Sequence, residues 1–196
     1  MKKILLIPFC IIFILNSIGC SPVGVVGGGA AGTMVVAEGD RSLGVVIDDA
    51  TIKLNISGKF ISSSDNLFIN IDTSVLEGRV LLTGLVDNQE IRIDAVKRVW
   101  EVEGVKEVIN EIEIGNRSSL KEYANDVWIT TQAKAVALQS IGLRAMSYNF
   151  ETIKGRVYIA GVTSRPDQLD SVVDAIKKIK GVKEIINYVI VKEKLS

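Results

Sequence analysis

The sequence contains no histidine, and its 196 residues include only two cysteines. Histidine is the commonest general base and the commonest metal ligand, so its absence disfavours both kinds of site. It also makes a Ser-His or Cys-His nucleophilic pair impossible, and no cluster of acidic residues and cysteines has the spacing of a metal site. We therefore expect a protein that is not an enzyme and that has no cofactor and no bound metal.

Residues 1–19 have the features of a secretory signal. Two lysines precede an apolar run, Ile4–Ile18, which is too short to span a bilayer comfortably. The run leads into LNSIGC, and a small residue before Cys20 is typical of a bacterial lipoprotein signal, with Ser17 where such signals usually carry Leu. We predict removal of residues 1–19 and acylation of Cys20. An ordinary signal peptide or an uncleaved anchor is the alternative.

Acylation would also account for an otherwise solitary thiol. Cys10 lies inside the signal, so Cys20 is the only cysteine of the predicted mature chain and has no partner for an internal disulfide. Ser21 follows it, whereas Asp at this position retains many such lipoproteins in the inner membrane. We therefore expect an outer-membrane protein that faces the periplasm.

The next segment, residues 20–47, is rich in glycine and small apolar residues. Gly27, Gly29 and Gly32 formally match the dinucleotide-binding pattern GxGxxG, but neither a strand nor a βαβ unit surrounds them. We interpret this segment as a flexible tether between the membrane and the folded part.

A repeat organises the rest of the chain. GVKEVIN at residues 104–110 returns as GVKEIIN at residues 181–187, and the same shift of 77 positions carries Gly78 onto Gly155 and Asp49 onto Asp126 without a gap. A constant shift over about 65 residues indicates duplication of one module. The predicted modules are residues 48–115 and 126–192, and residues 116–125 form the linker.

Each copy carries the same local signals in the same order. Apolar residues at helical spacing come first, with Asp49 and Asp126 as N-cap candidates, and a hairpin follows. A glycine, Gly84 or Gly161, ends the second strand and lets the chain leave the sheet. In the two copies the first strand is predicted at residues 68–75 and 146–153, the turn at 77–78 and 154–155, and the second strand at 79–84 and 156–161.

A second helix and a last strand complete each copy. Asp87 and Ser164 are its N-cap candidates, each with an acidic residue three positions later, and Gly104 and Gly181 end the helix. The opening of the repeated phrase is thus a helix stop before a strand. The apolar stripe of this helix comprises Val96, Val99 and Val102 in the first copy, and Leu169, Val172, Val173, Ile176 and Ile179 in the second.

These elements predict an α+β fold built from two tandem αββαβ modules. Each module is a three-stranded mixed sheet with two helices packed on one face. The other face of such a sheet needs cover, and a module of this size is only marginally stable alone. Two copies in one chain can bury these faces against each other.

The αββαβ order, the Gly-Arg-Val hairpin and the helix that ends in GVKE[VI]IN resemble the BON domain, a small module of the bacterial envelope. The lipoprotein signal, the glycine-rich tether, DRSLGVVIDDATI and NDVWITTQAK extend the likeness over the mature chain, which resembles outer-membrane lipoproteins with two BON domains. The resemblance implies a non-catalytic lipoprotein that supports envelope integrity. It also implies binding of anionic phospholipid by the first helix of the second module.

The residues of that helix are consistent with such a role. At 100° per residue, Trp128 lies about 125° from the centre of the core-facing stripe, so we expect it to point outward. An exposed indole has an apolar body and a polar N–H, which suits the headgroup level of a bilayer. The alternative is that Trp128 packs against the other module or the linker. The predicted phospholipid-binding residues are Asn125, Asp126, Val127, Trp128, Thr131 and Lys134.

The distribution of charge also favours the second half of the chain. Residues 21–116 carry 8 basic and 15 acidic side chains, a net charge of −7, whereas residues 117–196 carry 13 and 8, a net charge of +5. Four lysines, at positions 177, 178, 180 and 183, gather near the end of the second helix and would attract an anionic surface. Opposition to the helix dipole, or attraction to the acidic first module, explains them equally well.

We therefore predict anionic phospholipid, either phosphatidylglycerol or cardiolipin, as the ligand, with acylated Cys20 as the membrane anchor. Nucleic acid is disfavoured, because the chain is exported and slightly negative overall. One alternative is a periplasmic scaffold that binds proteins of the outer-membrane assembly or cell-wall machinery, with Trp128 or a sheet edge as its contact. Another is a soluble periplasmic holdase, which would carry no acyl chain.

Overall fold

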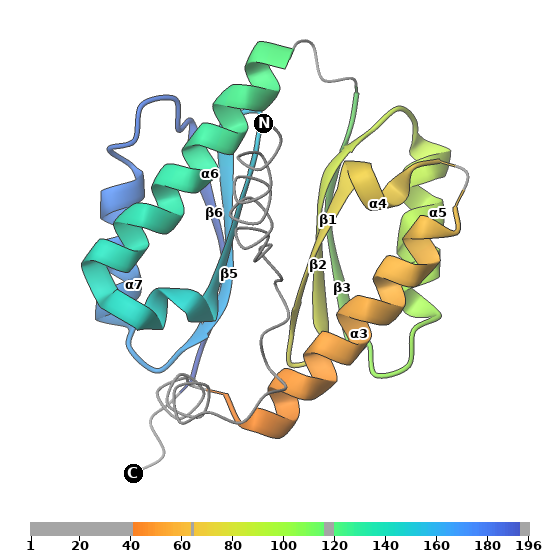
Figure 1. Cartoon of the computed structure of the whole chain (residues 1–196), viewed down its shortest axis with the longest axis horizontal. Helices are drawn as coiled ribbons and strands as arrows, with labels where there is room; N and C mark the ends of the chain where they lie inside the picture. Colours follow the sequence, from red (N-terminus) through yellow and green to blue (C-terminus); the bar gives the residue numbers. More distant parts are fainter. Residues whose placement is uncertain (1–40, 64, 116–119, 193–196) are drawn as a thin grey trace, which may run out of the picture. The chain divides into compact units, whose positions relative to one another are not determined.

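Two modules with the same order of elements make up the part of the chain that the structure describes (Figure 1). The structure is a computed structural model that describes residues 41–63, 65–115 and 120–192, all of which fall in one compact unit. The predicted signal (1–19), Cys20, residues 21–40 of the predicted tether and residues 116–119 of the predicted linker lie outside the described residues.

Both modules place two helical segments before a hairpin, and a helix before the last strand. The first module contains α3 (Leu43–Ile61), α4 (Leu67–Asn70), β1 (Ile71–Leu76), β2 (Arg79–Val86), α5 (Gln89–Trp100) and β3 (Glu107–Ile114). The second contains α6 (Leu120–Ile141), the 3-10 helix η2 (Gly142–Ser147), β4 (Tyr148–Ile153), β5 (Arg156–Thr163), α7 (Pro166–Ile176) and β6 (Glu184–Val191).

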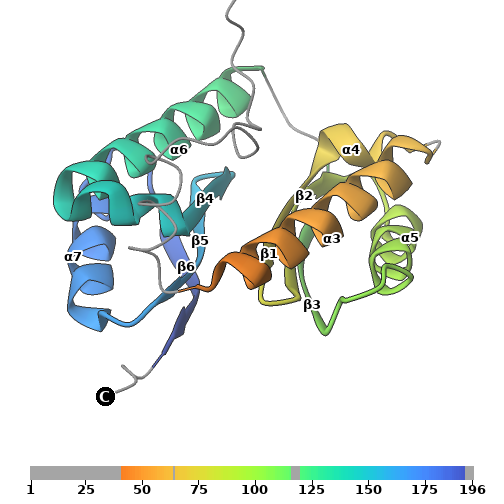
Figure 2. The same cartoon turned by 60° about the horizontal axis from the view of Figure 1, so that its bottom comes forward.

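Each module contains a three-stranded mixed sheet. β2 lies between β1, to which it is antiparallel, and β3, to which it is parallel. β5 has the same relation to β4 and β6. The two long helices of each module cover the same face of its sheet (Figures 1 and 2). The predicted α+β fold with two αββαβ modules is confirmed, and α4 and η2 are additions to it.

The core of each module lies between its sheet and these helices. Ile52, Ile56 and Phe60 of α3 are buried there, as are Ile129 and Ala133 of α6. The predicted stripe of the second helix is also confirmed. Val99, Val102, Leu169, Val172 and Ile176 are buried, and Val96, Val173 and Ile179 are partly buried against the same cores.

The hairpin turns form as the sequence predicts. Glu77 and Gly78 have φ angles of 58° and 80°, and Lys154 and Gly155 have φ angles of 51° and 82°. Positive φ at both central residues is the geometry of a two-residue turn whose twist matches that of the flanking strands.

The two aspartates predicted as N-caps have a different role. Asp49 is 5% exposed and lies inside α3, where its carboxylate accepts hydrogen bonds from the backbone N–H groups of Glu77 and Gly78, each at 2.9 Å. Asp126 lies inside α6 and accepts from the N–H groups of Lys154 and Gly155 at 2.8 and 2.9 Å. Both aspartates therefore join the first helix to the hairpin turn, and neither begins a helix.

The first helices accordingly start earlier than predicted. α3 begins at Leu43, with Ser42 as its N-cap, and α6 begins at Leu120. Residues 43–47, assigned to the tether, and residues 120–125, assigned to the linker, are therefore helical. The sequence misleads here because an aspartate ahead of an apolar period resembles a cap even when the helix already runs through it.

The first strands start later than predicted, at Ile71 and Tyr148. Residues 68–70 belong to α4 and residues 146–147 to η2. The second strands do not end at their glycines but continue to Val86 and Thr163. Phe68 and Ile69 of α4 are residues typical of strands, and the surrounding packing overrides that preference.

Gly84 and Gly161 have a packing role inside the second strands. Gly84 has a φ of 150°, and a Cβ there would lie 2.2 Å from the carbonyl oxygen of Asn70, at the end of α4. At Gly161 a Cβ would lie 2.9 Å from the carbonyl oxygen of Ser147, the last residue of η2, and 2.7 Å from Cδ1 of Tyr148. The absence of a side chain therefore lets the preceding short helix approach the central strand.

The caps of the second helices also differ from the prediction. Asn88, not Asp87, is the N-cap of α5, and its side chain accepts from the N–H group of Ile91 at 2.9 Å. α7 begins at Pro166, after Arg165, without a side-chain cap hydrogen bond, and proline suits the first helical position because the N–H group there has no partner within the helix. Gly104 and Gly181 follow the helices with φ angles of 89° and 98° and turn the chain toward the last strand.

The sheet faces that the helices leave open bury apolar residues of both modules. Leu76 and Leu81 of the first module and Ala160 and Val162 of the second form one buried cluster, with Tyr188 and other apolar residues packed against it. β1 contacts β5, and β2 contacts β4. The expectation that the two modules cover each other's open faces is confirmed.

Polar contacts surround this cluster. The hydroxyl of Tyr188 donates to the carboxylate of Glu111, and Glu113 pairs with Arg156. Burial raises the pKa of Tyr158 to about 12. Burial, together with the hydrogen bond to Glu111, raises the pKa of Tyr188 to about 12. Both tyrosines therefore stay neutral well above the pH at which a free tyrosine ionises.

Candidate lipid-binding helix

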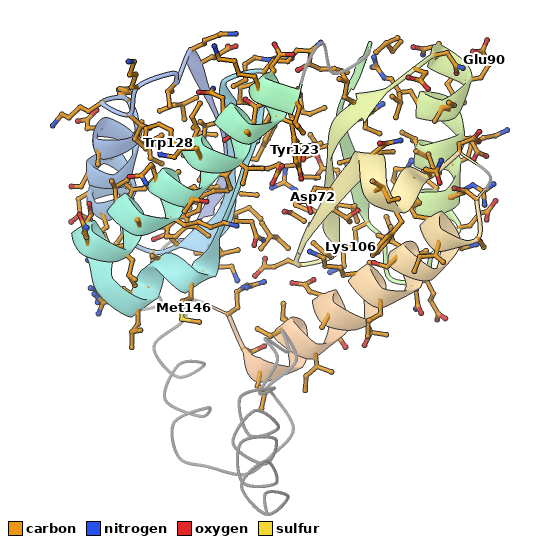
Figure 3. The ribbon with its side chains drawn as sticks, turned by 45° about the horizontal axis from the view of Figure 1, so that its top comes forward. Asp72, Glu90, Lys106, Tyr123, Trp128 and Met146 are labelled. Atoms are coloured by element: carbon orange, nitrogen blue, oxygen red, sulfur yellow. The ribbon has the colours of Figure 1, made fainter. Side chains whose placement is uncertain are left out.

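Helix α6 exposes the aromatic residue that the sequence singles out. Trp128 is 46% exposed, whereas the next residue, Ile129, is completely buried in the module core. The predicted outward orientation of Trp128 is therefore confirmed. Figure 3 shows Trp128 and Tyr123 on opposite sides of the α6 ribbon, so the helix presents two different flanks.

One flank of α6 borders a hollow of about 360 Å³. Val127, Thr131 and Lys134 line it, together with Phe68 and Ile69 of α4 in the first module. The hydroxyl of Thr131 donates to the carbonyl oxygen of Val127 at 2.8 Å, which leaves the side-chain methyl group as the outward part of this residue. Three of the predicted binding residues thus border a hollow of mixed character, in which Asp72 and Glu151 lie alongside the apolar Phe68 and Ile69.

The other flank carries Trp128 and adjoins the lysine-rich turn after α7. A Cβ added at Gly181 would lie 3.4 Å from Nδ2 of Asn125 and 3.1 Å from Cδ1 of Ile129. The turn therefore packs beside the first part of α6. Asn125 and Trp128 are three positions apart and share a helix face, so the turn lies on the Trp128 flank.

The lysines of this turn are exposed. Lys178, Lys180 and Lys183 are exposed, and so is Lys177, which pairs with Asp174 at 3.0 Å. The sequence alone does not determine how far this cluster lies from the tryptophan. The contact between Gly181 and Asn125 supplies that relation and joins an amphipathic side chain to a group of cations.

Equivalent positions of the two repeats show which residues at this end occur only in the second module. Glu77, Glu101 and Glu103 of the first module occupy the positions of Lys154, Lys178 and Lys180 in the second. Thr51 occupies the position of Trp128. One backbone arrangement therefore presents an acidic end with no tryptophan on its first helix in the first module, and a basic end with tryptophan on that helix in the second.

Asp126 differs from the other predicted binding residues. It is 9% exposed, and both of its carboxylate oxygens accept backbone N–H groups of the hairpin turn. A carboxylate also repels an anionic headgroup. We therefore assign Asp126 to the fold, and the remaining five residues stay predicted ligand contacts.

Exposed apolar residues that the sequence analysis did not single out extend the surface of α6. Leu120, Tyr123 and Leu138 are 83%, 43% and 50% exposed. Met146 of η2 is 65% exposed and is labelled in Figure 3. Leu120 lies before the predicted start of the module, and Leu138 lies well after the predicted binding residues. Both join this surface because α6 extends from Leu120 to Ile141.

The described residues contain no group of three or more acidic residues or cysteines that could hold a metal ion. Within the same residues, no helix combines the length and the apolar character needed to cross a bilayer. The surface of α6 offers an indole, aliphatic side chains and a lysine ammonium group.

Comparison with known proteins supports the interpretation of the repeat. The model of the BON domain matches residues 48–116 and 125–193. The chain is similar to the outer membrane lipoprotein DolP of Haemophilus influenzae, with 28% identity over 187 residues, which cover 95% of this chain and 94% of that protein.

Two other relatives match about three quarters of this chain. An uncharacterized protein in the gshII 5′ region of Anaplasma centrale is 39% identical over 144 residues, 73% of this chain and 94% of that protein. The osmotically-inducible protein Y of Escherichia coli is 26% identical over 149 residues, 75% of this chain and 74% of that protein.

Proposed function

Because the chain belongs to the BON-domain family, with two BON domains, we propose that it is a non-catalytic outer-membrane lipoprotein that binds anionic phospholipid through α6. Its similarity to an outer membrane lipoprotein over 95% of the chain supports the location. The sequence around Cys20 supports the anchor. In this proposal the protein faces the periplasm and supports the integrity of the envelope.

The single observation that carries the ligand assignment is the position of Trp128 beside the lysine-rich turn. The indole suits the level between headgroups and acyl chains, and the lysines suit the phosphates above it. Each lysine near an anionic surface contributes on the order of 1 kcal/mol. Phosphatidylglycerol and cardiolipin provide such phosphates, so we propose them as the ligands.

The acyl group and the helix act together in this proposal. A tethered α6 searches only the membrane surface nearby, so a contact that is weak in solution becomes effectively intramolecular. Stable anchoring by two weak signals is common among lipidated proteins. α6 would then act as a lipid-selective second contact, and the acyl chain would provide most of the membrane affinity.

Vesicle binding tests the ligand assignment. We would measure cosedimentation of the chain from residue 21 onward with vesicles of phosphatidylcholine alone, and with vesicles containing phosphatidylglycerol or cardiolipin. Trp128→Ala should reduce binding to anionic vesicles severalfold. Trp100→Ala is the matched control, because Trp100 is 52% exposed on the first module and should have no effect. Equal binding by both variants would remove α6 from the proposal.

One observation favours protein binding as a second candidate function. Phe68 and Ile69 are 53% and 75% exposed at the rim of the hollow beside α6, and exposed aromatic and aliphatic pairs are typical protein contacts. A scaffold for outer-membrane assembly or cell-wall proteins would use this rim. A photoreactive residue in place of Phe68 should then give a stoichiometric protein adduct in cells, whereas lipid binding alone should give none.

A further inference from the structure

Helix α3 has a second apolar face, on the side opposite its core. Ile52, Ile56 and Phe60 face the core of the first module and are at most 5% exposed. Leu43, Ile47, Leu54 and Ile61 are 50%, 54%, 70% and 65% exposed. At 100° per residue, these four side chains centre on the face turned away from the sheet. The proposed lipid contact at α6 does not use them.

The spacing of this face is that of a helix-pairing seam. Leu43, Ile47, Ala50, Leu54, Ser57 and Ile61 follow one another at alternating intervals of four and three residues. This alternation over the length of α3 is the pattern by which one helix packs along another. We call these six residues the α3 seam.

Polar groups at the seam are turned back onto the helix. The hydroxyl of Ser57 donates to the carbonyl oxygen of Lys53 at 2.9 Å. On the adjacent flank, the hydroxyl of Thr51 donates to the carbonyl oxygen of Ile47 at 2.9 Å. Neither hydroxyl therefore needs a new partner if the face becomes buried.

Two glycines flank the seam on the side of Thr51, and the module itself does not require them. Gly44 and Gly58 lie inside α3, and a Cβ added at either would meet nothing within 4 Å. Glycine inside a helix costs about 1 kcal/mol relative to alanine. Small residues beside an apolar seam permit the close approach of a second helix.

The second module keeps only part of this seam, with Leu120, Val127 and Leu138 at the positions of Leu43, Ala50 and Ile61. The repeat places Thr131 at the position of Leu54 and Lys134 at that of Ser57. It also places Lys121 and Ala135 at the positions of the two glycines. The apolar centre of the seam and its flanking glycines are therefore particular to α3.

We propose that the α3 seam pairs with the α3 seam of a second copy of this chain, with the two helices antiparallel. In antiparallel pairs the two sets of seam positions face each other. Large residues then meet small ones at the centre, with Leu54 against Ala50 and Ile47 against Ser57 of the other copy. Leu43 meets Ile61 at the two ends. Such a contact is self-complementary, as a two-fold dimer requires.

Charge and area favour a second copy over a bilayer. Helix α3 carries two aspartates and two lysines, a net charge of zero, so it has no excess positive charge to attract an anionic membrane and no net charge to repel a second α3. Lys59 is already paired with Glu101 at 2.7 Å. The four large seam residues would remove roughly 400 Å² of apolar surface per copy, near the lower limit of a specific interface once flanking residues are added. The dimer is thus weak in solution, and confinement to a membrane strengthens it.

Disulfide trapping tests the arrangement in the full-length chain in membranes. Ala50→Cys combined with Leu54→Cys should form a covalent dimer on mild oxidation, because these positions face each other across an antiparallel pair. Leu54→Cys alone should not, because its two copies are offset along the helices. Val127→Cys with Thr131→Cys, the same positions in the second module, is the matched control and should remain monomeric. Trapping by the single variant would indicate a parallel pair and overturn the proposal.

Sedimentation of the full-length chain in detergent provides a second measurement. Wild type should show a monomer–dimer equilibrium, and Leu54→Glu should weaken it by roughly tenfold or more, because a carboxylate would replace an apolar contact. Thr131→Glu is the matched control and should leave it unchanged. A monomer at all concentrations would overturn the proposal, as would capture of a different protein or loss of vesicle binding by Leu54→Glu. Trp128→Ala should leave dimer formation intact. Failure of the lipid-binding proposal can therefore be told apart from failure of the dimer proposal.

Discussion

Asp49 and Asp126 each connect the first helix of a module to the hairpin turn 28 residues later. The carboxylate accepts two backbone N–H groups that the turn would otherwise leave unpaired in a buried place. Hydrogen bonds to a charged acceptor are stronger than those between neutral groups, and an unpaired buried donor is costly. These residues are therefore expected to control the stability of the modules.

We predict that Asp126→Ala lowers the free energy of unfolding by about 2–5 kcal/mol, because it leaves the N–H groups of Lys154 and Gly155 without acceptors. Asp126→Asn should cost less, because its amide oxygen still accepts one of them. Urea denaturation followed by circular dichroism measures both effects. A wild-type urea midpoint for Asp126→Ala would show that the contact contributes nothing.

The sequence revealed these aspartates but not their function. An acidic residue ahead of an apolar helical period has the local pattern of an N-cap, and the partner N–H groups belong to residues distant in the chain. The exposure of Trp128 was predictable, because it depends only on the angular position of one residue on a helix. The contact between Gly181 and Asn125 was not, because it depends on how α6 and α7 pack together.

Two tyrosines near the contact between the modules differ in how their hydroxyls are satisfied. Tyr188 donates to Glu111. The hydroxyl of Tyr158 is buried and has no hydrogen-bond partner among the described residues. At pH 7 we predict that Tyr188→Phe lowers the free energy of unfolding by about 1 kcal/mol, whereas Tyr158→Phe leaves it unchanged or slightly higher. Urea midpoints of the two variants measure the difference, and an equal loss in both would contradict it.

The same tyrosines predict a loss of stability at alkaline pH. Their pKa values in the folded protein are about 12, above the value of about 10 for an unfolded chain. Folding therefore favours the protonated form, and this contribution is complete below pH 10 and is lost as pH rises toward 12. The double variant Tyr158→Phe/Tyr188→Phe should lose less stability than wild type between pH 10 and pH 12, as followed by urea midpoints. Parallel curves for the two proteins would contradict the assignment.

At the scale of elements, two glycines of the first module differ in whether the fold has room for a side chain. A side chain at Gly84 would collide with the carbonyl oxygen of Asn70, whereas one at Gly58 would enter open space. We predict that Gly84→Ala lowers the free energy of unfolding by about 3 kcal/mol or more. Gly58→Ala should raise that of the monomer by about 0.5–1 kcal/mol. Thermal unfolding of dilute protein distinguishes the two, and similar shifts would show that the close approach at Gly84 is easily relaxed.

The elements that could be predicted are those specified by local chemistry. Tight turns need positive φ at Glu77-Gly78 and Lys154-Gly155, and apolar spacing fixes the core face of each long helix. α4 and η2 could not be predicted, because a helix of one or two turns has too few residues to show a period. Their position follows from the close approach to Gly84 and Gly161, which only the folded structure reveals.

At the scale of the molecule, the two modules carry opposite net charge on a shared fold. If the lysines after α7 contact anionic lipid, binding must weaken as salt screens the charges. We predict that Lys178→Glu combined with Lys180→Glu lowers affinity for phosphatidylglycerol vesicles at least tenfold, at about 1 kcal/mol for each charge removed.

Matched substitutions in the first module provide the control for this prediction. Glu101→Lys combined with Glu103→Lys alters the equivalent positions, and these changes should raise binding only slightly, because Thr51 stands there at the position of Trp128 and the first helix of that module offers no indole. Vesicle cosedimentation at low and physiological salt measures both double variants. Insensitivity of wild-type binding to salt would argue against the lysine contact.

Glu111 and Tyr188, which are hydrogen-bonded to each other, occupy the same position in the two repeats. If two separate, identical modules formed a symmetric dimer, the residue at this position would face the same residue of the other subunit. Two glutamates would repel, and two tyrosines would lack the carboxylate acceptor. Covalent fusion of the modules removes this constraint, because each copy can mutate alone. The duplicated chain can therefore place an acid opposite a phenol, a pairing that identical subunits cannot form on their symmetry axis.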